Sequence, residues 1–344
     1  MSKRGYPPEK KGPGIYIAAG VLVLLICLIV GGLIFFEKDT AESTEQSSVE
    51  APDYDNPEKW AEGVISYNGQ KYKYNNNIRT YLFLGIDKEE PVRKVPDGID
   101  GGQADGLFLL VENRDKGKLS IIAIHRNTMT AVKTCDEKGE YTGDRELQIC
   151  LQHGYGDGER ISCQRTVECV SNLFYGIPIN GYMSLNMGGI GILNDAVGGV
   201  EVTVLQNLDS EKRNVHLVQG ETKVLSGDEA YVYVRSRDVN EFDSASGRLE
   251  RQEQYLNALL PVMLKKITSG SSAVSIYNKA EDYLFSNIDY ARLADEMSGL
   301  TYDGSEDMYN IPGEVVMGNQ FEEFYVDEDG LYQLILDVFY DKVD

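Results

Sequence analysis

Three short apolar runs separated by polar turns follow one another in the first half of the chain, at residues 80–86, 107–112 and 118–124. Each run is rich in Leu, Ile, Phe or Val, which is typical of strands that are buried on both faces. The polar segment 113–117 joins the last two runs and predicts a tight hairpin between them. Two later segments, 200–204 and the alternating 231–237, predict further strands.

Segments with the apolar spacing of helices alternate with these predicted strands. They lie at 165–175, within 181–197, and at 248–267, 289–300 and 331–340. We expect the second to begin with a turn and to end at Gly198-Gly199, and Asp289 is a suitable N-cap for the fourth. Strands interleaved with helices predict an α/β domain, a three-layer α/β/α sandwich whose central mixed sheet is covered on both faces.

An uncharged apolar run at residues 15–36 precedes this domain. Its 22 residues are enough to cross a bilayer core as a helix, which needs about 20. Basic residues precede the run and acidic residues follow it, so the positive-inside rule places the N-terminus in the cytosol. A cleaved signal peptide is the alternative, which the length of the run and the lack of an A-x-A site disfavour.

The predicted organisation follows from this span. A cytoplasmic tail at 1–14 leads into a single transmembrane helix at 15–36. An acidic, Ser/Thr-rich extracytoplasmic linker at 37–62 then leads to one globular domain at 63–344, whose core covers about residues 75–265. We therefore expect a single-pass protein of the cell membrane with its globular domain outside the cell.

The charge of the chain restricts its partners. The 344 residues carry a formal net charge of −22, and 42% of them are hydrophobic, enough for a sizeable core. The negative field repels a phosphate backbone, so nucleic acid is excluded as a partner of the surface as a whole. A local basic pocket could still hold a phosphorylated ligand.

Four of the five cysteines fall within one stretch of the chain: Cys135, Cys150, Cys163 and Cys169. In an extracellular domain an even cluster of this kind predicts two disulfides, whose pairing the sequence does not define. A zinc site is the alternative, although the spacings contain no C-x-x-C pair.

Polar residues stand at the ends of the first three predicted strands. Asp87 follows the first strand, Asp105 precedes the second and Arg126 follows the third. If these strands are sequential antiparallel neighbours, the three residues fall at one end of the sheet. Two acids suit Mg²⁺, and an arginine beside them suits a phosphate. The alternative is that they are only the solvated ends of strands.

Four arginines lie close together in this acidic domain. Arg235 and Arg237 are two positions apart on a predicted strand, and therefore share one face. Arg248 and Arg251 are three apart on a predicted helix, with Gln252 beside them. Such a group suits a pyrophosphate, which guanidinium groups hold through bidentate hydrogen bonds. Salt bridges to the many nearby acids are the alternative.

Eight short segments in order along the chain match the pattern of one family. They are LFLGID at 82–87, ADG at 104–106, LSIIAIHRNT at 119–128, CLQHGY at 150–155, DAVGGV at 195–200, LSGDEA at 225–230, YVRSRD at 233–238 and GRLERQ at 247–252. Through them the chain resembles the LytR-CpsA-Psr proteins, the cell-envelope-related transcriptional attenuator family, over about residues 75–265. Its C-terminal part resembles that of clostridial-type members.

This resemblance implies an extracytoplasmic phosphotransferase of cell-wall assembly. Such enzymes bind a glycopolymer linked to polyprenyl pyrophosphate, for example teichoic acid or capsule, and transfer it to a peptidoglycan hydroxyl. By analogy Asp87 and Asp105 hold Mg²⁺ or Mn²⁺ and act in catalysis with Arg126, while apolar helices cover the lipid tail. The implied pyrophosphate-binding residues are Arg126, Arg235, Arg237, Arg248, Arg251 and Gln252.

The chain departs from the family pattern at positions beside these residues. Gln103-Ala104-Asp105 stands where the family usually has Arg-Ser-Asp, and His125-Arg126-Asn127 where it usually has Pro-Arg-Asp. Cys150 replaces a common lysine and Ala245 an aspartate. Each lost charge-assisted contact costs about 1.5–3 kcal/mol, so a second hypothesis stays open, a non-catalytic binder or regulator that holds the lipid-linked precursor. A plain structural ectodomain is the third.

Overall fold

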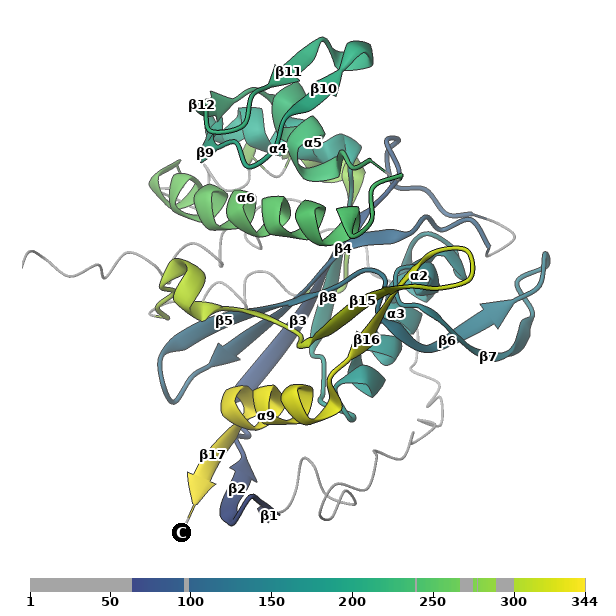
Figure 1. Ribbon diagram of the computed structural model, residues 1–344, viewed down its shortest axis with the longest axis vertical. Helices are drawn as coiled ribbons and strands as arrows, with labels where there is room; N and C mark the ends of the chain where they lie inside the picture. Colours follow the sequence, from purple (N-terminus) through teal and green to yellow (C-terminus); the bar gives the residue numbers. More distant parts are fainter. Residues whose placement is uncertain are drawn as a thin grey trace, which may run out of the picture.

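A six-stranded mixed sheet forms the centre of the domain, in the spatial order β13-β8-β3-β4-β5-β14 (Figure 1). The structure is a computed structural model that describes residues 64–95, 99–238, 240–266, 275–276, 278–288 and 300–343. The strands of the central sheet are β13 (Leu284–Ser286), β8 (Gly181–Asn186), β3 (Ile78–Ile86), β4 (Ala104–Asn113), β5 (Lys118–Ile124) and β14 (Met308–Asn310). The prediction of three sequential antiparallel strands is confirmed, because β4 pairs antiparallel with both β3 and β5.

Both faces of this sheet are buried. Along β3, Leu82 and Leu84 contribute to one apolar core and Tyr81 contributes to the other. The sheet continues on both sides through parallel pairs, β3 with β8 and β5 with β14. Because both faces are covered, the strands appear in the sequence as continuous apolar runs instead of an alternation with polar residues.

In the described part of the chain, the helices that cover one face of the sheet include α4 (Gly188–Val197), α5 (Gly227–Arg235) and α6 (Ser244–Lys266). Helix α4 ends where the sequence predicts, because Gly198 adopts the left-handed conformation with φ of 92°. Two small antiparallel sheets pack with these helices (Figure 1). One pairs β9 (Val200–Thr203) with β12 (Thr222–Leu225), and the other β10 (Leu208–Ser210) with β11 (Val215–Leu217).

Helices α3 (Arg160–Leu173) and α9 (Glu328–Phe339) cover the opposite face, so the predicted three-layer sandwich is confirmed. The short helix α2 (Leu151–Gly154) packs against α3. A small sheet on the α9 side joins the two ends of the described chain: β1 (Val64–Tyr67), β2 (Gln70–Tyr74) and β17 (Tyr340–Val343). Single 3-10 turns lie at Glu211–Arg213, Glu281–Tyr283 and Gly304–Asp307.

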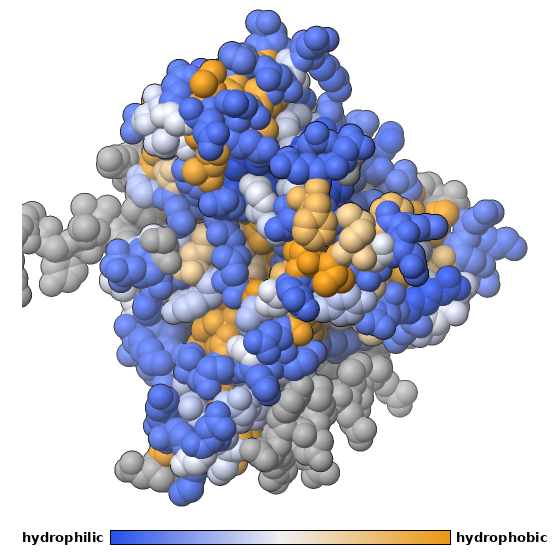
Figure 2. Space-filling model, in the orientation of Figure 1, coloured by the Kyte–Doolittle hydropathy of each residue, from blue (hydrophilic) through white to orange (hydrophobic). Residues whose placement is uncertain are grey.

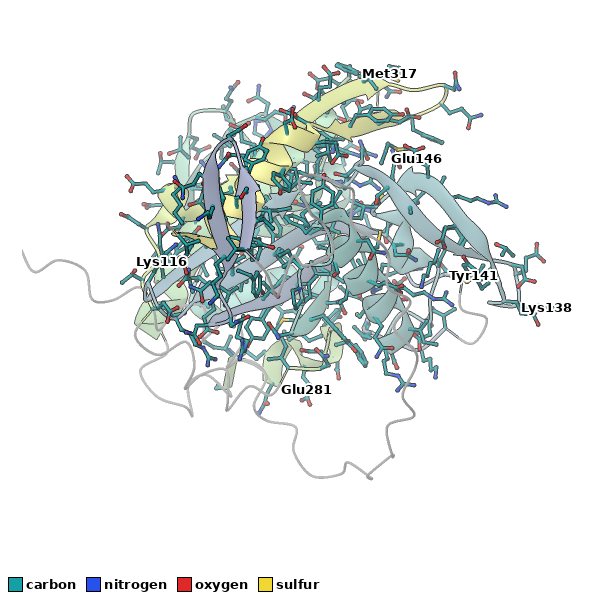
Figure 3. All side chains as sticks on the ribbon, turned by 90° about the horizontal axis from the view of Figure 1, so that it is seen from below. Lys116, Lys138, Tyr141, Glu146, Glu281 and Met317 are labelled. Atoms are coloured by element: carbon teal, nitrogen blue, oxygen red, sulfur yellow. The ribbon has the colours of Figure 1, made fainter. Side chains whose placement is uncertain are left out.

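Two hairpins project from this body. One joins β6 (Met129–Cys135) to β7 (Tyr141–Gln148), and the other joins β15 (Gly313–Met317) to β16 (Glu322–Val326). Figure 3 shows Lys138 and Tyr141 on the first hairpin and Met317 on the second. Apolar residues gather over the β15–β16 side of the surface in Figure 2.

The prediction of a strand at 231–237 is wrong, because most of this segment belongs to helix α5. The helix begins at the N-cap Ser226, whose hydroxyl accepts a hydrogen bond from the backbone N–H of Glu229 while the Glu229 carboxylate accepts one from the Ser226 N–H. All residues from Ala230 to Val234 are buried. A helix buried on nearly every side shows no 3.6-residue pattern, so alternating Tyr and Val were uninformative.

The turn expected at the start of 181–197 is also wrong. Residues 181–186 form β8, which runs parallel to β3 from the pair Tyr81 and Gly181 onward. The local signal Asn180-Gly181 favours a turn, but the Asn180 amide donates a hydrogen bond to Thr80 O and the chain continues along the edge of β3. Tertiary pairing therefore overrides the local preference.

The N-terminal predictions lie outside the described residues. These are the tail at 1–14, the transmembrane helix at 15–36 and the linker at 37–62, and nearly all of the helix expected at 289–300 is outside as well. Within the described part of the chain, none of the helices combines the length and the apolar character that crossing a bilayer requires.

Candidate active site

The polar ends of three central strands meet at one edge of the sheet. The antiparallel register places the end of β3, the start of β4 and the end of β5 side by side, and with them Asp87, Asp105 and Arg126. Arg126 Nε lies 2.7 Å from Asp105 Oδ1. The structure therefore brings together the three residues that the sequence predicted to converge.

Asp105 lies between two guanidinium groups. Arg248, near the start of α6, places Nη1 2.7 Å from Asp105 Oδ2, the oxygen opposite to the one that Arg126 contacts. Both arginine side chains are nearly buried. Burial opposes ionisation of Asp105, but the charges of Arg248 and Arg126 outweigh it and hold the pKa of this carboxyl below its usual range. Asp105 is therefore a carboxylate at neutral pH and balances part of the positive charge.

Asp87 has a different environment. Its Oδ1 accepts a hydrogen bond of 2.7 Å from the backbone N–H of Gln103, and its Oδ2 has no hydrogen-bond partner among the described residues. Burial raises the pKa of Asp87, and the nearby charge of Asp105 adds to this effect. The two carboxyl groups are thus close enough to influence each other, with one oxygen of Asp87 still available.

The donor set fits Mg²⁺ better than a transition metal. In the described part of the chain no group of three or more His, Cys, Asp and Glu side chains gathers as a metal cluster. Mg²⁺ is usually bound through one or two carboxylates together with substrate phosphates and water. Asp87, with its available Oδ2, and Asp105 beside it are consistent with that mode of binding.

The four arginines predicted as one cluster have different environments. Arg248 belongs to the centre just described. Arg237 lies after the end of α5, is partly exposed, and its charge acts on Asp105. Arg235 is exposed, with its guanidinium carbon 5.6 Å from the ring centroid of Tyr231. Since α5 ends at Arg235, the prediction that Arg235 and Arg237 share one strand face is wrong.

Arg251 is buried inside the protein and binds the protein itself. Its Nε donates to Tyr233 O at 2.9 Å, and its two terminal nitrogens donate to Gly247 O, to Ser236 O and to the side chain of Gln206. These bonds fix the backbone around the end of α5 relative to the start of α6. The geometry gives Arg251 a positioning role for the end of α5, which carries Arg235, and for the following loop, which carries Arg237.

An apolar channel leads away from the charged centre between the sheet and the helices α4 and α6. It encloses about 1170 Å³ free of protein atoms, its mouth included. Gly85, Gly106 and Gln252 line its polar end. Apolar side chains line the rest, including Phe83, Phe108, Met183, Leu193, Tyr255 and Leu259.

Two buried polar atoms at the charged end lack partners. Gln252 donates its amide N–H to Val234 O at 3.0 Å, but its Oε1 has no hydrogen-bond partner within the described structure. Arg248 Nη2 is likewise a buried donor without one. Buried groups of this kind are costly unless a ligand or water completes them. The junction of the channel and the charged centre is therefore suited to a ligand with polar groups at one end and a long apolar part at the other.

The profile of the LytR_cpsA_psr family matches residues 36–335 of the chain. The chain belongs to this family. The resemblance seen in the sequence is thus confirmed, and the match extends beyond the core of about 75–265 into the C-terminal part.

Relatives of this LytR_cpsA_psr protein include polyisoprenyl-teichoic acid–peptidoglycan teichoic acid transferases named TagU. This chain is 25% identical over 294 residues to TagU of Enterococcus faecalis, and the match covers 85% of this chain and 84% of the relative. It is 30% identical over 179 residues to TagU of Halalkalibacterium halodurans, covering 52% of this chain. The latter match spans about half of the relative, 51% of its length.

Solved structures share the fold. B. subtilis TagV has a TM-score of 0.56 at 23% identity, with 77% of this chain and 96% of TagV covered. Protein gbs0355 from Streptococcus agalactiae has a TM-score of 0.61 at 18% identity, covering 76% and 86%. A structure of TagT bound to LI-WTA has a TM-score of 0.53 at 20% identity, covering 85% and 94%.

The residues that depart from the LytR_cpsA_psr pattern surround Arg126. The Gln103 side chain accepts a hydrogen bond from Arg126 Nη2, and the Asn127 side chain accepts one of 2.9 Å from Nη1. Cys150 Sγ lies 3.8 Å from Gln103 Oε1. Neutral amides thus hold the guanidinium of Arg126 in place, so the residue keeps its position although the neighbouring charges of the family pattern are absent.

His125 is buried beside this group and is neutral. Its ring stacks on Phe324 with centroids 4.8 Å apart, and its Nδ1 accepts a hydrogen bond of 3.2 Å from the Asn127 N–H. Burial lowers the pKa of His125 to about 4, with further lowering by the charges of Arg126 and Arg248. His125 therefore does not replace a lost cation at neutral pH.

The β15–β16 hairpin supports the site, and the sequence did not reveal it. Glu322 accepts a hydrogen bond of 2.6 Å from the Asp243 N–H and one of 3.3 Å from the Asn127 side chain. Phe324, two residues later, stacks on His125 and donates its N–H to Asn127 O at 2.9 Å. No local motif marks these residues, and their distance along the chain from Asn127 hides the contact.

The predicted disulfides are not present in the described part of this LytR_cpsA_psr protein. Cys135, Cys150, Cys163 and Cys169 are free. Three of the sulfurs contact different polar groups of the protein. Cys163 Sγ lies 3.9 Å from His153 Nε2, Cys169 Sγ lies 3.5 Å from Ala131 O, and Cys135 Sγ accepts from Arg165. The prediction relied on the even number of cysteines and was wrong, because the thiols are separate small residues in the core or at its edge.

Proposed function

We propose that this protein transfers a glycopolymer from a polyprenyl-pyrophosphate carrier to a hydroxyl of peptidoglycan. The names of the TagU relatives describe transfer of teichoic acid to peptidoglycan, and one similar structure is TagT bound to LI-WTA. The observation that carries the proposal is the junction of the apolar channel with the arginine-lined strand ends, at Gly106 and Gln252. A lipid pyrophosphate has the same two parts, an apolar tail and an anionic head.

The positive charge at the strand ends suits phosphoryl transfer. In the reaction the acceptor oxygen bonds to the phosphorus that carries the glycan, and the bond from this phosphorus to the polyprenyl phosphate breaks and leaves its electron pair there. The hydroxyl proton passes to water. Arg126, Arg248 and Arg237 neutralise charge on the pyrophosphate, and Arg248 Nη2 offers it a buried donor that lacks a partner. Gln252 Oε1 is an acceptor and is available to a hydroxyl group or a water. Arg235 extends the positive surface towards the glycan.

Asp87 and Asp105 are the residues that would hold Mg²⁺ in this protein. The metal would supply additional positive charge to the pyrophosphate. Asp105 also orients Arg126 and Arg248, because its two oxygens contact one guanidinium each. The peptidoglycan, the lipid-linked donor and the membrane are the partners that this reaction requires, with the domain outside the cell on the anchor expected at 15–36.

A non-catalytic role is the second candidate, and one observation favours it. Both oxygens of Asp105 face a guanidinium at 2.7 Å, so the carboxylate must reorganise before it can also bind a metal. A protein in which Asp105 served only to hold arginines would bind the lipid-linked precursor without transferring the glycan.

The test uses the full chain in detergent with a lipid-linked teichoic acid donor and peptidoglycan. We expect release of polyprenyl phosphate that depends on Mg²⁺ and stops with a chelator. Arg248→Gln is expected to lower turnover by about 10- to 100-fold, because it removes charge-assisted hydrogen bonds worth about 1.5–3 kcal/mol. Arg79→Gln, on β3 far along the sheet from the site, is the matched control and should retain turnover.

The outcomes separate the two candidates. Tight binding of polyprenyl pyrophosphate without release, under Mg²⁺ and Mn²⁺, would identify the binder. If the protein did not bind polyprenyl pyrophosphate at all, both the transferase and the non-catalytic binder would be contradicted. A second variant is needed in case Arg248→Gln fails to fold. Gly106→Val adds bulk at the polar end of the channel, where a new Cβ would lie 3.6 Å from Gln252 Oε1. This variant should weaken lipid binding.

A further inference from the structure

A second pocket lies beyond the strand ends, where the apolar channel stops. Along β3 the channel is lined as far as Gly85, and the second pocket begins at Asp87. Along β4, in the opposite direction, the channel is lined as far as Gly106 and the second pocket begins at Gln103. Asp105 lies in the chain between Gln103 and Gly106 and lines neither space. The two cavities therefore approach the charged centre from different sides.

The second pocket differs from the channel in chemistry. Its cavity volume is about 360 Å³, which is at the lower end of the range of small-ligand sites. Its walls combine hydrogen-bonding groups with three apolar surfaces, Ile99, Leu151 and Tyr155. No hydrogen bond of the Tyr155 hydroxyl is present within the described structure, so this group remains available to a ligand.

The charges of this pocket do not favour an anion. Its one basic group among the described residues is Lys88, whose Nζ lies 2.8 Å from Asp100 Oδ1. Asp87 and Asp100 outnumber Lys88, so the net charge of the pocket is negative. A phosphate is therefore repelled, whereas a neutral sugar is not. Sugar rings carry hydroxyl groups at their edges and C–H groups on their faces, which match the polar walls and the Tyr155 ring.

The pocket is formed before any ligand arrives. The loop that follows β3 is attached to the α2 region by a hydrogen bond of 3.3 Å from the Gly101 N–H to Gly154 O and by His153 Nδ1, 3.0 Å from Gly102 O. Gly101 has no space for a side chain, because a Cβ would lie 2.5 Å from His153 O. A preformed site loses less conformational entropy on binding than a mobile one.

We propose that this second pocket binds the acceptor, a neutral amino sugar of a peptidoglycan glycan strand, with its reacting hydroxyl beside Asp87. This inference rests on the proposed function. Phosphoryl transfer requires the attacking and the leaving oxygen to lie roughly in line. With the polyprenyl phosphate leaving into the channel, the attacking hydroxyl must arrive from the side of the charged centre away from it. The second pocket opens on that side.

The experiment measures binding of the two substrates separately in the full chain. The probes are polyprenyl pyrophosphate and a neutral tetrasaccharide of alternating N-acetylglucosamine and N-acetylmuramic acid whose lactyl carboxyl groups are amidated, each followed by calorimetry. Tyr155→Ala should weaken tetrasaccharide binding by at least about tenfold, or about 1.4 kcal/mol, and leave lipid binding within about twofold. Tyr141→Ala, on the exposed β6–β7 hairpin (Figure 3), is the matched control and should change neither.

A second variant covers a possible folding defect of Tyr155→Ala. Asp100 has a side chain that is 74% exposed, so Asp100→Ala is expected to fold and to weaken tetrasaccharide binding as well. Equal tetrasaccharide binding by the wild type and both variants would overturn the inference, as would a wild type that binds the lipid but no tetrasaccharide at about 10 mM. Tetrasaccharide binding that both variants weaken, in a protein that does not bind the lipid, would support the sugar pocket and reject the transferase.

Discussion

Arg248 Nη1 lies 2.7 Å from Asp105 Oδ2, and this ion pair connects α6 to β4 across 143 positions of the chain. This ion pair fixes α6, which lines the apolar channel, to the start of β4. It thereby places the polar end of the channel at the charged centre. Binding and catalysis in the proposed reaction therefore depend on the same buried ion pair.

Removal of the Asp105 charge is expected to lower stability as well as activity. Asp105→Asn leaves Arg126 and Arg248 as buried cations without a counter-charge, which costs about 3–5 kcal/mol in typical buried ion pairs. Urea denaturation measures this change in the free energy of unfolding. Glu146→Gln, an exposed acid on β7 (Figure 3), is the control and should leave it unchanged. An Asp105→Asn midpoint equal to that of the wild type would show that the arginines do not need this carboxylate.

The buried, neutral side chain of His125 makes the free energy of unfolding depend on pH. The pKa of His125 is about 4 in the folded protein, against the ordinary value of 6.5 for histidine. Between these values the unfolded chain binds a proton that the folded one does not, so the free energy of unfolding falls as the pH falls from 6.5 towards 4. His125→Gln should reduce this slope by up to about 1.4 kcal/mol per pH unit. Urea denaturation at several pH values in that window measures both slopes.

The matched control for this titration is His216→Gln. His216 is exposed on β11, so the His216→Gln curve shows what removal of a surface histidine does to the slope. Carboxylates contribute to acid destabilisation in all three proteins, so the comparison of slopes isolates His125. Parallel curves for His125→Gln and the wild type would mean that His125 is protonated in the folded state.

The strand ends were predictable because they depend on local order alone. Sequential antiparallel strands place Asp87, Asp105 and Arg126 at one edge whatever the rest of the fold does. Helical spacing placed Arg248 and Arg251 on one face of α6 with Gln252 beside them, but only Arg248 and Gln252 lie at the charged centre, because Arg251 bonds to carbonyl groups of the protein. The apolar channel was expected only through the family resemblance, because the space between a sheet and its helices depends on packing that the sequence pattern does not specify.

Other parts of the site depended on long-range contacts. The alternation at 231–237 suggested a strand because tertiary burial of α5 on nearly every side removes the helical pattern. Arg251 looked like a ligand-binding residue, yet it bonds to carbonyl groups whose positions only the fold determines. Glu322 lies 195 positions from Asn127, so no spacing argument could have joined them.

The β15–β16 hairpin is expected to matter for turnover more than for lipid binding. Glu322 holds Asn127 and the Asp243 backbone, and Asn127 in turn holds Arg126. Glu322→Ala should lower kcat of the proposed transfer by about tenfold, in keeping with the loss of about 1–3 kcal/mol from unsatisfied partners. The affinity for polyprenyl pyrophosphate, whose channel the hairpin does not line, should stay within about twofold.

The neighbouring acid offers a close control for this variant. Glu323 contacts the hydroxyl of Tyr325 within the same hairpin and does not contact Asn127 or Asp243. Glu323→Ala should therefore keep kcat and lipid affinity. If Glu322→Ala and Glu323→Ala behave alike in both measurements, the hairpin has no positioning role at the site.

The four cysteines of the domain are expected to behave as free thiols with very different reactivity. Cys150, Cys163 and Cys169 are buried, and burial raises their pKa values to about 11, 12 and 12, so few thiolates form at neutral pH. Cys135 is only partly buried. In a Cys27→Ser variant of the full chain, a thiol reagent should label Cys135 in the native protein and all four after denaturation without reductant, as measured by mass spectrometry. Labelling that requires prior reduction would instead demonstrate the disulfides that the cysteine spacing suggested.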